Sequence, residues 1–243
     1  MSEQMLANCG KFFGVGVGPG DPSLLTIRAA EVLKQVDVVC IPRSRAENDS
    51  VAMKVASAYI AKTAEIMEVL TPMVRDAETL EAEWQRGAEK IAKYLLSGKN
   101  VAFITIGDAM LFSTYTYLMK KVREIIPGVA VESIPGVTSF SAAAAYLNEA
   151  LAEGSEKLAI IPAIDDPEQL REIFAQFSNV VLMKVAGKYD QIVNVLAELG
   201  LKDNAVYMSR IGYPEQFVSF DLDSLRGTKL DYLSLLLVKR EGF

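Results

Sequence analysis

The stretch Gly14-Val15-Gly16-Val17-Gly18-Pro19-Gly20-Asp21-Pro22 follows an apolar segment and precedes an amphipathic one. Glycine lets the backbone approach a ligand closely, and the first turn of a helix presents N–H groups without helical partners. The stretch therefore predicts a ligand-binding turn between a strand over residues 11–17 and a helix over residues 22–36, with Asp21 as N-cap and Pro22 as first helical residue. A tight turn without a ligand is the alternative.

Short apolar runs alternate with longer amphipathic segments through the first half of the chain, which is typical of an α/β sheet with helices on its faces. The further strands predicted here cover residues 37–42, 101–106 and 131–134. The further helices cover residues 50–61, 76–96, 114–125 and 139–147. Each of these strands is followed by a helix, which predicts a parallel sheet.

The composition shifts over residues 149–157, which are charged and small and predict an exposed connection. We place the domain boundary there, with an N-terminal domain over 1–152 and a C-terminal domain over 153–243. The second domain is predicted to hold helices over 167–177 and 189–199, and strands over 158–162, over 180–185 and near Val206, Phe217 and Leu235. Because the last three strands have no helices between them, this sheet is predicted to be mixed.

The composition excludes several classes of protein. The chain has 243 residues, no histidine and a formal net charge of -6. Without histidine, Ser-His-Asp and Cys-His nucleophile systems and HExxH metal sites are excluded. The acidic net charge also disfavours a nucleic-acid partner, because neutralising phosphate groups would need a clustered basic face.

The two cysteines and the apolar runs bear on location. Cys9 and Cys40 do not have CxxC or zinc-ligand spacing, so neither a disulfide framework nor a metal site is predicted. Residues 1–5 show no basic segment leading into a long apolar run, and no later apolar run has the length of a membrane span. We therefore expect a cytoplasmic protein that does not associate with a membrane.

Two further turns follow predicted strands. One is Thr105-Ile106-Gly107-Asp108-Ala109-Met110-Leu111-Phe112-Ser113-Thr114, and the other is Ser133-Ile134-Pro135-Gly136-Val137-Thr138-Ser139. Open α/β sheets bind ligands at the carboxyl ends of their strands, so three such turns predict a shared pocket. The dinucleotide fingerprint GxGxxG would need glycine at Pro19 or Asp21, which disfavours a nicotinamide cofactor.

Taken together, these segments resemble the tetrapyrrole methylase family, a class of S-adenosylmethionine-dependent enzymes. The resemblance runs from the first glycine turn through Gly107-Asp108 and residues 135–139 to Val181-Leu182-Met183-Lys184, Ser209-Arg210-Ile211-Gly212 and residues 231–238. Ala109 departs from the family, in which proline commonly follows Gly-Asp. Within the family, residues 41–44, 50–52 and 132–141 resemble the branch that methylates C20 of precorrin-2 or cobalt-factor II.

The resemblance implies a two-domain α/β fold, S-adenosylmethionine bound between the domains, a tetrapyrrole substrate and a homodimer. By position, it assigns contacts with the cofactor to Pro19, Ile106, Gly107, Asp108, Leu111, Thr138, Ser139, Lys184 and Gly212. For Lys184, the alternative is an exposed structural side chain, with only the backbone touching the cofactor.

Methyl transfer from a sulfonium mainly requires alignment of donor and acceptor, so the lack of histidine is no obstacle. The methylated carbon must then lose a proton, and the candidate acceptors are Asp108, Tyr115 and Glu132. For each of them the alternative is turn capping, core packing or a solvated position.

The carboxylates of a tetrapyrrole require positive charge nearby, because the protein itself is acidic. The candidate substrate-binding residues are Arg28, Arg43 and Arg45, near the ends of the first two strands. Ordinary surface charge is the alternative for each. Methylation of uroporphyrinogen III or of another precorrin position, or a non-catalytic cofactor-binding module, also remain alternatives for the whole chain.

Overall fold

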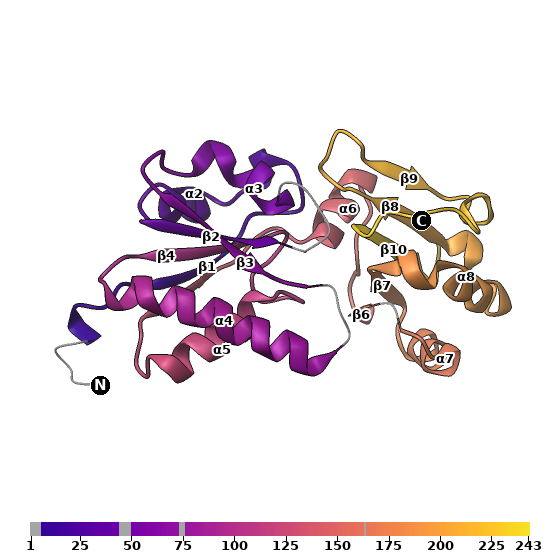
Figure 1. Cartoon of the computed structure of the whole chain (residues 1–243). Helices are drawn as coiled ribbons and strands as arrows, with labels where there is room; N and C mark the ends of the chain where they lie inside the picture. The colour runs from indigo at the N-terminus through magenta and orange to yellow at the C-terminus, as the bar shows by residue number, and fades with distance from the viewer. Residues whose placement is uncertain (1–5, 44–49, 73–75, 163) are drawn as a thin grey trace. The chain divides into compact units, whose positions relative to one another are not determined.

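Five parallel strands form the sheet of the N-terminal part of the chain, in the order β3-β2-β4-β1-β5 (Figure 1). They are β1 (Phe12–Gly16), β2 (Val38–Arg43), β3 (Glu65–Leu70), β4 (Val101–Thr105) and β5 (Val131–Ile134). The central strands are apolar throughout because helices cover both faces of the sheet. Since all strands run in one direction, the carboxyl ends of β4, β1 and β5 lie side by side.

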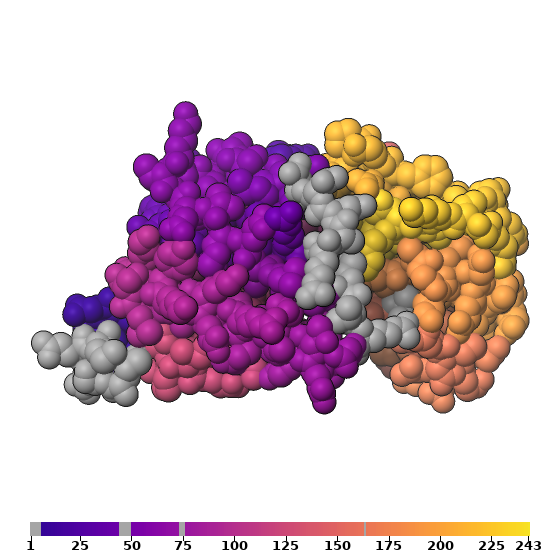
Figure 2. All heavy atoms as spheres, viewed as in Figure 1, coloured from indigo at the N-terminus to yellow at the C-terminus, as the bar shows by residue number. Residues whose placement is uncertain are grey.

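Helices α2 (Ile27–Leu33) and α3 (Val51–Ala56) lie on one face of this sheet, and α4 (Ala77–Leu96) and α5 (Tyr115–Ile125) on the other (Figure 1). The core between the sheet and α4 and α5 includes the buried side chains of Phe12, Phe103, Ile91, Leu95 and Leu118. The opposite side of α4 is rich in charged residues and stays on the surface, in magenta in Figure 2.

The C-terminal part of the chain contains a second, mixed sheet in the order β6-β7-β10-β8-β9. Its strands are β6 (Leu158–Pro162), β7 (Asn179–Met183), β8 (Ala205–Ser209), β9 (Phe217–Ser219) and β10 (Ser234–Lys239). Only β6 and β7 pair in parallel, and the other neighbours are antiparallel. The predicted parallel and mixed sheets are therefore both confirmed.

Helices α7 (Pro167–Gln176) and α8 (Tyr189–Glu198) pack on the second sheet through buried residues such as Phe174 and Ile192. Helix α6 (Ser139–Leu147) precedes this sheet in the chain.

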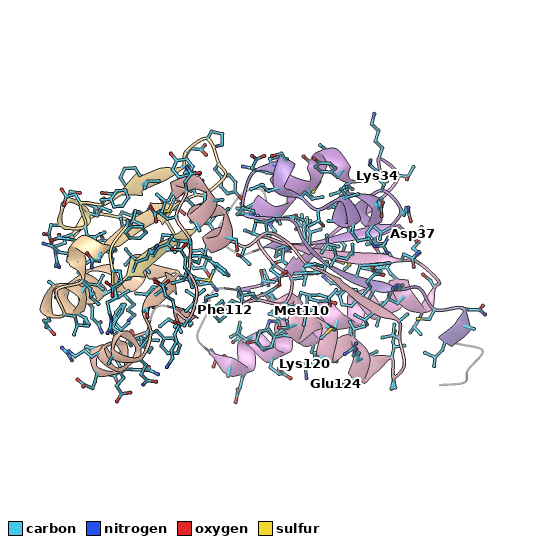
Figure 3. All side chains as sticks on the ribbon, turned by 180° about the vertical axis from the view of Figure 1, so that it is seen from behind. Lys34, Asp37, Met110, Phe112, Lys120 and Glu124 are labelled. Atoms are coloured by element: carbon cyan, nitrogen blue, oxygen red, sulfur yellow. The ribbon has the colours of Figure 1, made fainter. Side chains whose placement is uncertain are left out.

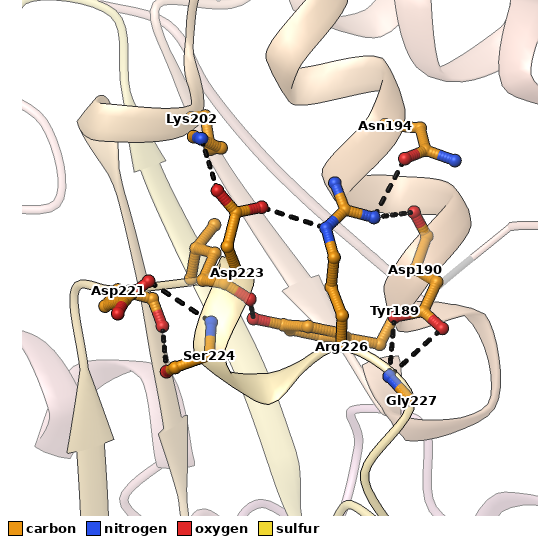
Figure 4. A network of polar contacts seen from close by, with 10 residues as sticks. Tyr189, Asp190, Asn194, Lys202, Asp221, Asp223, Ser224, Arg226 and Gly227 are labelled. Atoms are coloured by element: carbon orange, nitrogen blue, oxygen red, sulfur yellow. Dashed lines mark hydrogen bonds and ion pairs between the residues drawn. The ribbon is translucent and has the colours of Figure 1, made fainter.

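A polar network connects the segment before β10 to α8 (Figure 4). Arg226 donates to Asp223 at 2.9 Å and to Asn194 at 2.8 Å. The network holds the start of α8, and with it the short helix η3 (Val185–Lys188), in a defined position.

The computed structural model describes residues 6–43, 50–72, 76–162 and 164–243. By its internal contacts the chain divides into two units, Met1–Thr138 and Ser139–Phe243. This division falls before α6, whereas the composition places the domain boundary after it, at 152/153; that boundary stays a prediction. No helix in the described ranges is both long enough and apolar enough to cross a membrane.

Two predictions about the first unit are wrong in detail. The helix expected over 22–36 is interrupted: a short helix η1 (Pro22–Leu24) ends in extended backbone at Leu25, and α2 begins after Thr26. The Thr26 hydroxyl accepts a hydrogen bond from the Ala29 N–H at 3.2 Å, so it caps a new helix. Strand β3 has no predicted counterpart, because this edge strand interrupts its apolar residues with Glu65 and Glu68 and buries only Val69 completely.

Candidate active site

Three turns meet at the carboxyl edge of the first sheet. They follow β1, β4 and β5, which are neighbours in the sheet, and they contain the three glycine-bearing segments identified in the sequence. The Gly107 N–H donates to the Gly18 carbonyl at 2.8 Å, and the Gly18 N–H donates to the Gly107 carbonyl at 3.2 Å. The first two turns are thus joined backbone to backbone.

Asp108 joins the second turn to the third. One carboxylate oxygen accepts a hydrogen bond from the Gly136 N–H at 2.9 Å, and the other accepts one from the Met110 N–H at 2.8 Å. Hydrogen bonds to a charged acceptor are stronger than neutral ones, so this side chain fixes the relative positions of the two turns. The three turns therefore contact one another, and the shared pocket expected from them stays a prediction.

The close approach of the turns depends on glycine. A Cβ atom at Gly136 would lie 2.1 Å from the Gly107 carbonyl oxygen, and one at Gly16 would lie 2.7 Å from the same atom. Gly107 has a φ of +72° and no atom within 4 Å of its hypothetical Cβ position. The edge therefore has a tightly packed base and open space beside Gly107, where a ligand can approach the backbone.

The predicted cofactor contacts of the first unit all belong to these turns. Pro19 is buried, and Ile106, Leu111 and Thr138 are half-buried. Between Asp108 and α5, the side chains of Met110 and Phe112 are 53% and 46% exposed, and both are labelled in Figure 3. Phe112 adopts a φ of +49°, which is unusual for a bulky residue.

The remaining predicted cofactor contacts belong to the second unit. Ser139 is the first residue of α6, Lys184 follows β7, and Gly212 lies three residues beyond β8. The Lys184 N–H donates to the Ser234 carbonyl at 2.8 Å, and the Arg210 N–H donates to the Leu233 carbonyl at 2.9 Å. The carboxyl ends of β7 and β8 therefore flank the start of β10, and Lys184 and Gly212 belong to this edge.

Ser234 carries a polar group that sequence reasoning did not single out. Its side chain is buried, and its hydroxyl has no hydrogen-bond partner among the described residues. An unsatisfied buried hydroxyl costs free energy unless a ligand or water binds it. The motif over residues 231–238 contains this serine, but its burial and missing partner are visible only once β10 is placed between β7 and β8.

The three candidate proton acceptors lie in different surroundings. Asp108 belongs to the carboxyl edge, with both oxygens bonded to backbone amides. Tyr115 is fully buried under Gly14, its hydroxyl is 2.9 Å from that of Ser133, and burial raises the pKa of its phenol above the ordinary value. This position suits core packing better than proton transfer.

Glu132 is engaged in ion pairs with Lys11 at 2.6 Å and with Arg28 at 2.9 Å. Hydrogen bonds from Lys11 and then Arg28 hold the pKa of the Glu132 carboxyl below its ordinary value. Lys11 immediately precedes β1, so the group lies toward the amino end of the sheet rather than at the turns. Two separately predicted site residues, Glu132 and Arg28, thus neutralise each other.

Arg43 is the last residue of β2, is exposed, and forms an ion pair with Glu68 on β3. It lies at the carboxyl end of its strand, on the same edge of the sheet as the three turns. Arg45 lies outside the described residues. Of the predicted basic residues in the described ranges, Arg43 is therefore the one whose strand position matches that edge.

The fold and its glycine-bearing edge define an α/β protein whose candidate ligand site lies at the carboxyl ends of parallel strands. Residues 11–225 match the family model of the tetrapyrrole (corrin/porphyrin) methylases. The chain belongs to this family, whose members are S-adenosylmethionine-dependent methyltransferases.

Two relatives extend over almost the whole chain. A cobalt-precorrin-2 C(20)-methyltransferase from Salmonella typhimurium is 34% identical over 96% of this chain and 97% of its own length. A probable cobalt-precorrin-2 C(20)-methyltransferase from Methanocaldococcus jannaschii is 35% identical over 95% of this chain and 96% of its own.

Solved structures share the fold. A cobalt precorrin-4 methyltransferase superposes with a TM-score of 0.74 at 20% identity, covering 94% of both chains. A uroporphyrin-III C-methyltransferase from Thermus thermophilus, crystallised with S-adenosylhomocysteine, gives a TM-score of 0.66 at 23% identity and covers 95% of this chain and 97% of its own. At these identities the likeness supports the fold alone, and it agrees with the two-sheet architecture described above.

Proposed function

We propose that this chain transfers a methyl group from S-adenosylmethionine to C20 of precorrin-2 or of cobalt-factor II, in corrin biosynthesis. The observation that carries the proposal is the full-length similarity, at 34% and 35% identity, to two enzymes named for C20 methylation of cobalt-precorrin-2. The three hydrogen-bonded glycine turns support the proposal, because they form a rigid, preformed surface at the carboxyl edge of the sheet on which a small ligand can bind.

Each edge, taken by itself, has a feature that fits a small ligand. Open space beside Gly107 leaves room for a ligand against the backbone, and Ser234 offers a buried hydroxyl that lacks a partner in the described part of the chain. We propose that Pro19, Ile106, Gly107, Asp108, Leu111, Thr138 and Ser139 hold the cofactor. The contacts assigned to the backbone of Lys184 and to Gly212 remain predictions of the same kind.

Bound S-adenosylmethionine supplies an activated methyl group on a sulfonium. The task of the protein is then to align this group with a nucleophilic carbon and to exclude water, and alignment contributes about 7–11 kcal/mol in favourable cases. Rigidity is what alignment needs, and Asp108 provides it by fixing two turns through its two hydrogen bonds. We infer that Asp108 positions these turns and is not the group that removes the proton.

Binding of a polycarboxylate by an acidic protein requires local positive charge. We propose Arg43 as a substrate-binding residue, because the substrate can compete with Glu68 for its guanidinium. Arg43→Ala should then raise the KM of the tetrapyrrole and leave the KM of S-adenosylmethionine unchanged. Equal changes in both KM values would argue against this role.

We also propose that the protein acts in the cytoplasm, as its two unpatterned cysteines suggest, and that it forms the homodimer that the resemblance implies. Light scattering after size-exclusion chromatography measures the mass directly. A mass near twice the 26.5 kDa of one chain is expected. A mass of one chain at micromolar concentration would contradict the dimer without affecting the proposed reaction.

The decisive experiment uses S-adenosylmethionine carrying a 13C-labelled methyl group. The protein is incubated with precorrin-2, cobalt-factor II or uroporphyrinogen III, and the labelled carbon is located by NMR. Label at C20 of either of the first two substrates is expected, and the comparison between them identifies the preferred ring. Label at another carbon would indicate a different tetrapyrrole methylase, and cofactor binding without transfer to any ring would indicate a binding module.

A further inference from the structure

Lys184 combines a strained backbone with a position at the carboxyl edge of the second sheet. It adopts the left-handed conformation, with φ 60° and ψ 44°, directly after β7. Arg210 does the same after β8, with a φ of 50°. Glycine adopts this conformation without strain, whereas lysine and arginine adopt it at a cost. The backbone conformation therefore does not explain why a long cationic side chain stands at either position.

The two cations differ in their partners. Arg210 donates to Asp231 at 2.7 Å, and the other oxygen of Asp231 accepts a hydrogen bond from the Leu233 N–H at 2.8 Å. Both oxygens of Asp231 therefore have hydrogen-bond partners, and no ion pair joins Asp231 to Lys184. Across the described residues, no carboxylate lies within ion-pair distance of the Lys184 ammonium.

An aromatic ring lies next to the Lys184 side chain instead. The ammonium is 5.8 Å from the centre of the Tyr232 ring, and Tyr232 is 49% exposed. A cation–π contact orients an ammonium but leaves its charge unneutralised. By contrast, Lys188, Lys202 and Lys239 of the same unit each pair with a carboxylate.

We propose that the Lys184 ammonium binds a carboxylate of the tetrapyrrole, with Tyr232 as a positioning residue that orients the ammonium. The assignment rests on the proposed function, because it takes a polycarboxylate ring as the substrate. A protein with a net charge of -6 repels such a ligand, so a cation that forms no ion pair with the described residues lowers that barrier at a ligand-binding edge. A charge-assisted hydrogen bond then replaces water on both partners.

The test compares Lys184→Met with Lys157→Met. Lys157 is an exposed lysine without an ion pair in the described part of the chain, and it lies just before β6, at the other end of the same pair of strands. Both variants lose one charge. The dissociation constant of cobalt-factor II is measured by absorbance titration without S-adenosylmethionine, and that of S-adenosylmethionine by calorimetry.

We expect Lys184→Met to weaken binding of cobalt-factor II at least tenfold and to reduce its dependence on salt concentration, while S-adenosylmethionine binding changes less than twofold. Lys184→Arg should retain most of the affinity, and Lys157→Met should match the wild type. Tyr232→Phe should bind like the wild type and Tyr232→Leu more weakly, because the ring is required and the hydroxyl is not.

Equal affinity of Lys184→Met and Lys157→Met for cobalt-factor II would overturn the assignment. A loss of affinity for S-adenosylmethionine alone would also overturn it, because Lys184 would then bind the carboxylate of the cofactor. Lys184→Asn suits the left-handed backbone, and its circular dichroism and affinity separate lost charge from lost folding. If the wild type binds the ring without methylating it, the proposed function fails while the Lys184 assignment stands on binding alone.

Discussion

The Asp108 carboxylate and the Gly136 N–H, 28 residues apart in sequence, are joined by a hydrogen bond of 2.9 Å. This bond links the turn after β4 to the turn after β5, and the Met110 N–H occupies the other carboxylate oxygen. Asp108, the acidic residue of the family motif, thus fixes the positions of two turns at the carboxyl edge of the sheet.

Asp108→Asn should weaken cofactor binding about tenfold or more. An amide has one acceptor oxygen, so one of the two backbone N–H groups loses its partner, at a cost of about 1–3 kcal/mol. Calorimetry with S-adenosylmethionine measures the affinity, and urea unfolding measures the stability. Asp166→Asn is the matched control, because Asp166 likewise accepts a backbone N–H, at 2.9 Å from Glu168, at the start of α7. Cofactor affinity equal to wild type in Asp108→Asn would contradict the positioning role.

Gly136→Ala should disrupt the edge more severely than Gly107→Ala. The added methyl group at residue 136 would lie 2.1 Å from the Gly107 carbonyl oxygen, whereas the one at residue 107 meets no atom within 4 Å. Gly107→Ala lowers the free energy of unfolding by about 1–2 kcal/mol, because alanine is strained at a φ of +72°. Gly136 does not have a positive φ, but alanine there must displace backbone at a 2.1 Å contact, so we expect a cost at or above the upper end of the about 1–3 kcal/mol typical of overpacking. Urea unfolding of both variants tests the order, and the reverse order would contradict the close approach.

Tyr115→Phe should keep the rate of methyl transfer within about threefold and cost about 1 kcal/mol of stability, because it removes one hydrogen bond, to Ser133, from a buried ring. Ser133→Ala removes the same bond from the other side and serves as the control. A hundredfold fall in kcat for Tyr115→Phe, with stability preserved, would restore the tyrosine as a proton acceptor. Single-turnover rates measure the effect on methyl transfer, and urea unfolding measures the effect on stability.

Most elements of the fold could be predicted because their sequence signals are local. Asp76 and Gly98 bound α4, and β5 and α6 have the predicted bounds. Strand β3 could not be found, because its stability comes from pairing with β2 and from only one fully buried side chain, Val69. Leu25 has the helical spacing of its neighbours, but the capping bond of Thr26 outweighs that pattern.

The candidate site shows the same division between local and distant signals. The glycine turns are local motifs, and parallel pairing places them together. Arg28 and Glu132 were predicted for separate roles, yet they pair across 104 residues, a contact that no spacing rule shows. The buried hydroxyl of Ser234 likewise depends on where β10 enters the sheet. Charge partners and orphaned polar groups are properties of the packed chain.

The group formed by Glu132, Lys11 and Arg28 predicts a specific dependence of stability on pH. Hydrogen bonds from the two cations hold the pKa of Glu132 below its ordinary value of 4.5 in the folded chain. The unfolded chain therefore takes up the proton first as the pH falls. The stabilising contribution is complete above the unfolded pKa and is lost as the pH falls through the lower, folded pKa.

Glu132→Gln removes this titration, so its free energy of unfolding should fall less steeply than that of the wild type between about pH 5 and pH 3. Urea unfolding at several pH values measures both curves. At pH 7 the variant should be the less stable of the two, and added salt should narrow the gap, because the carboxylate side chain is 28% exposed and partly screened. The matched control is Glu31→Gln, an exposed acid that also faces Arg28 but only at 3.4 Å. Curves of equal slope for wild type and Glu132→Gln would show that the ion pairs contribute nothing to acid stability, and would leave Glu132 free for another role.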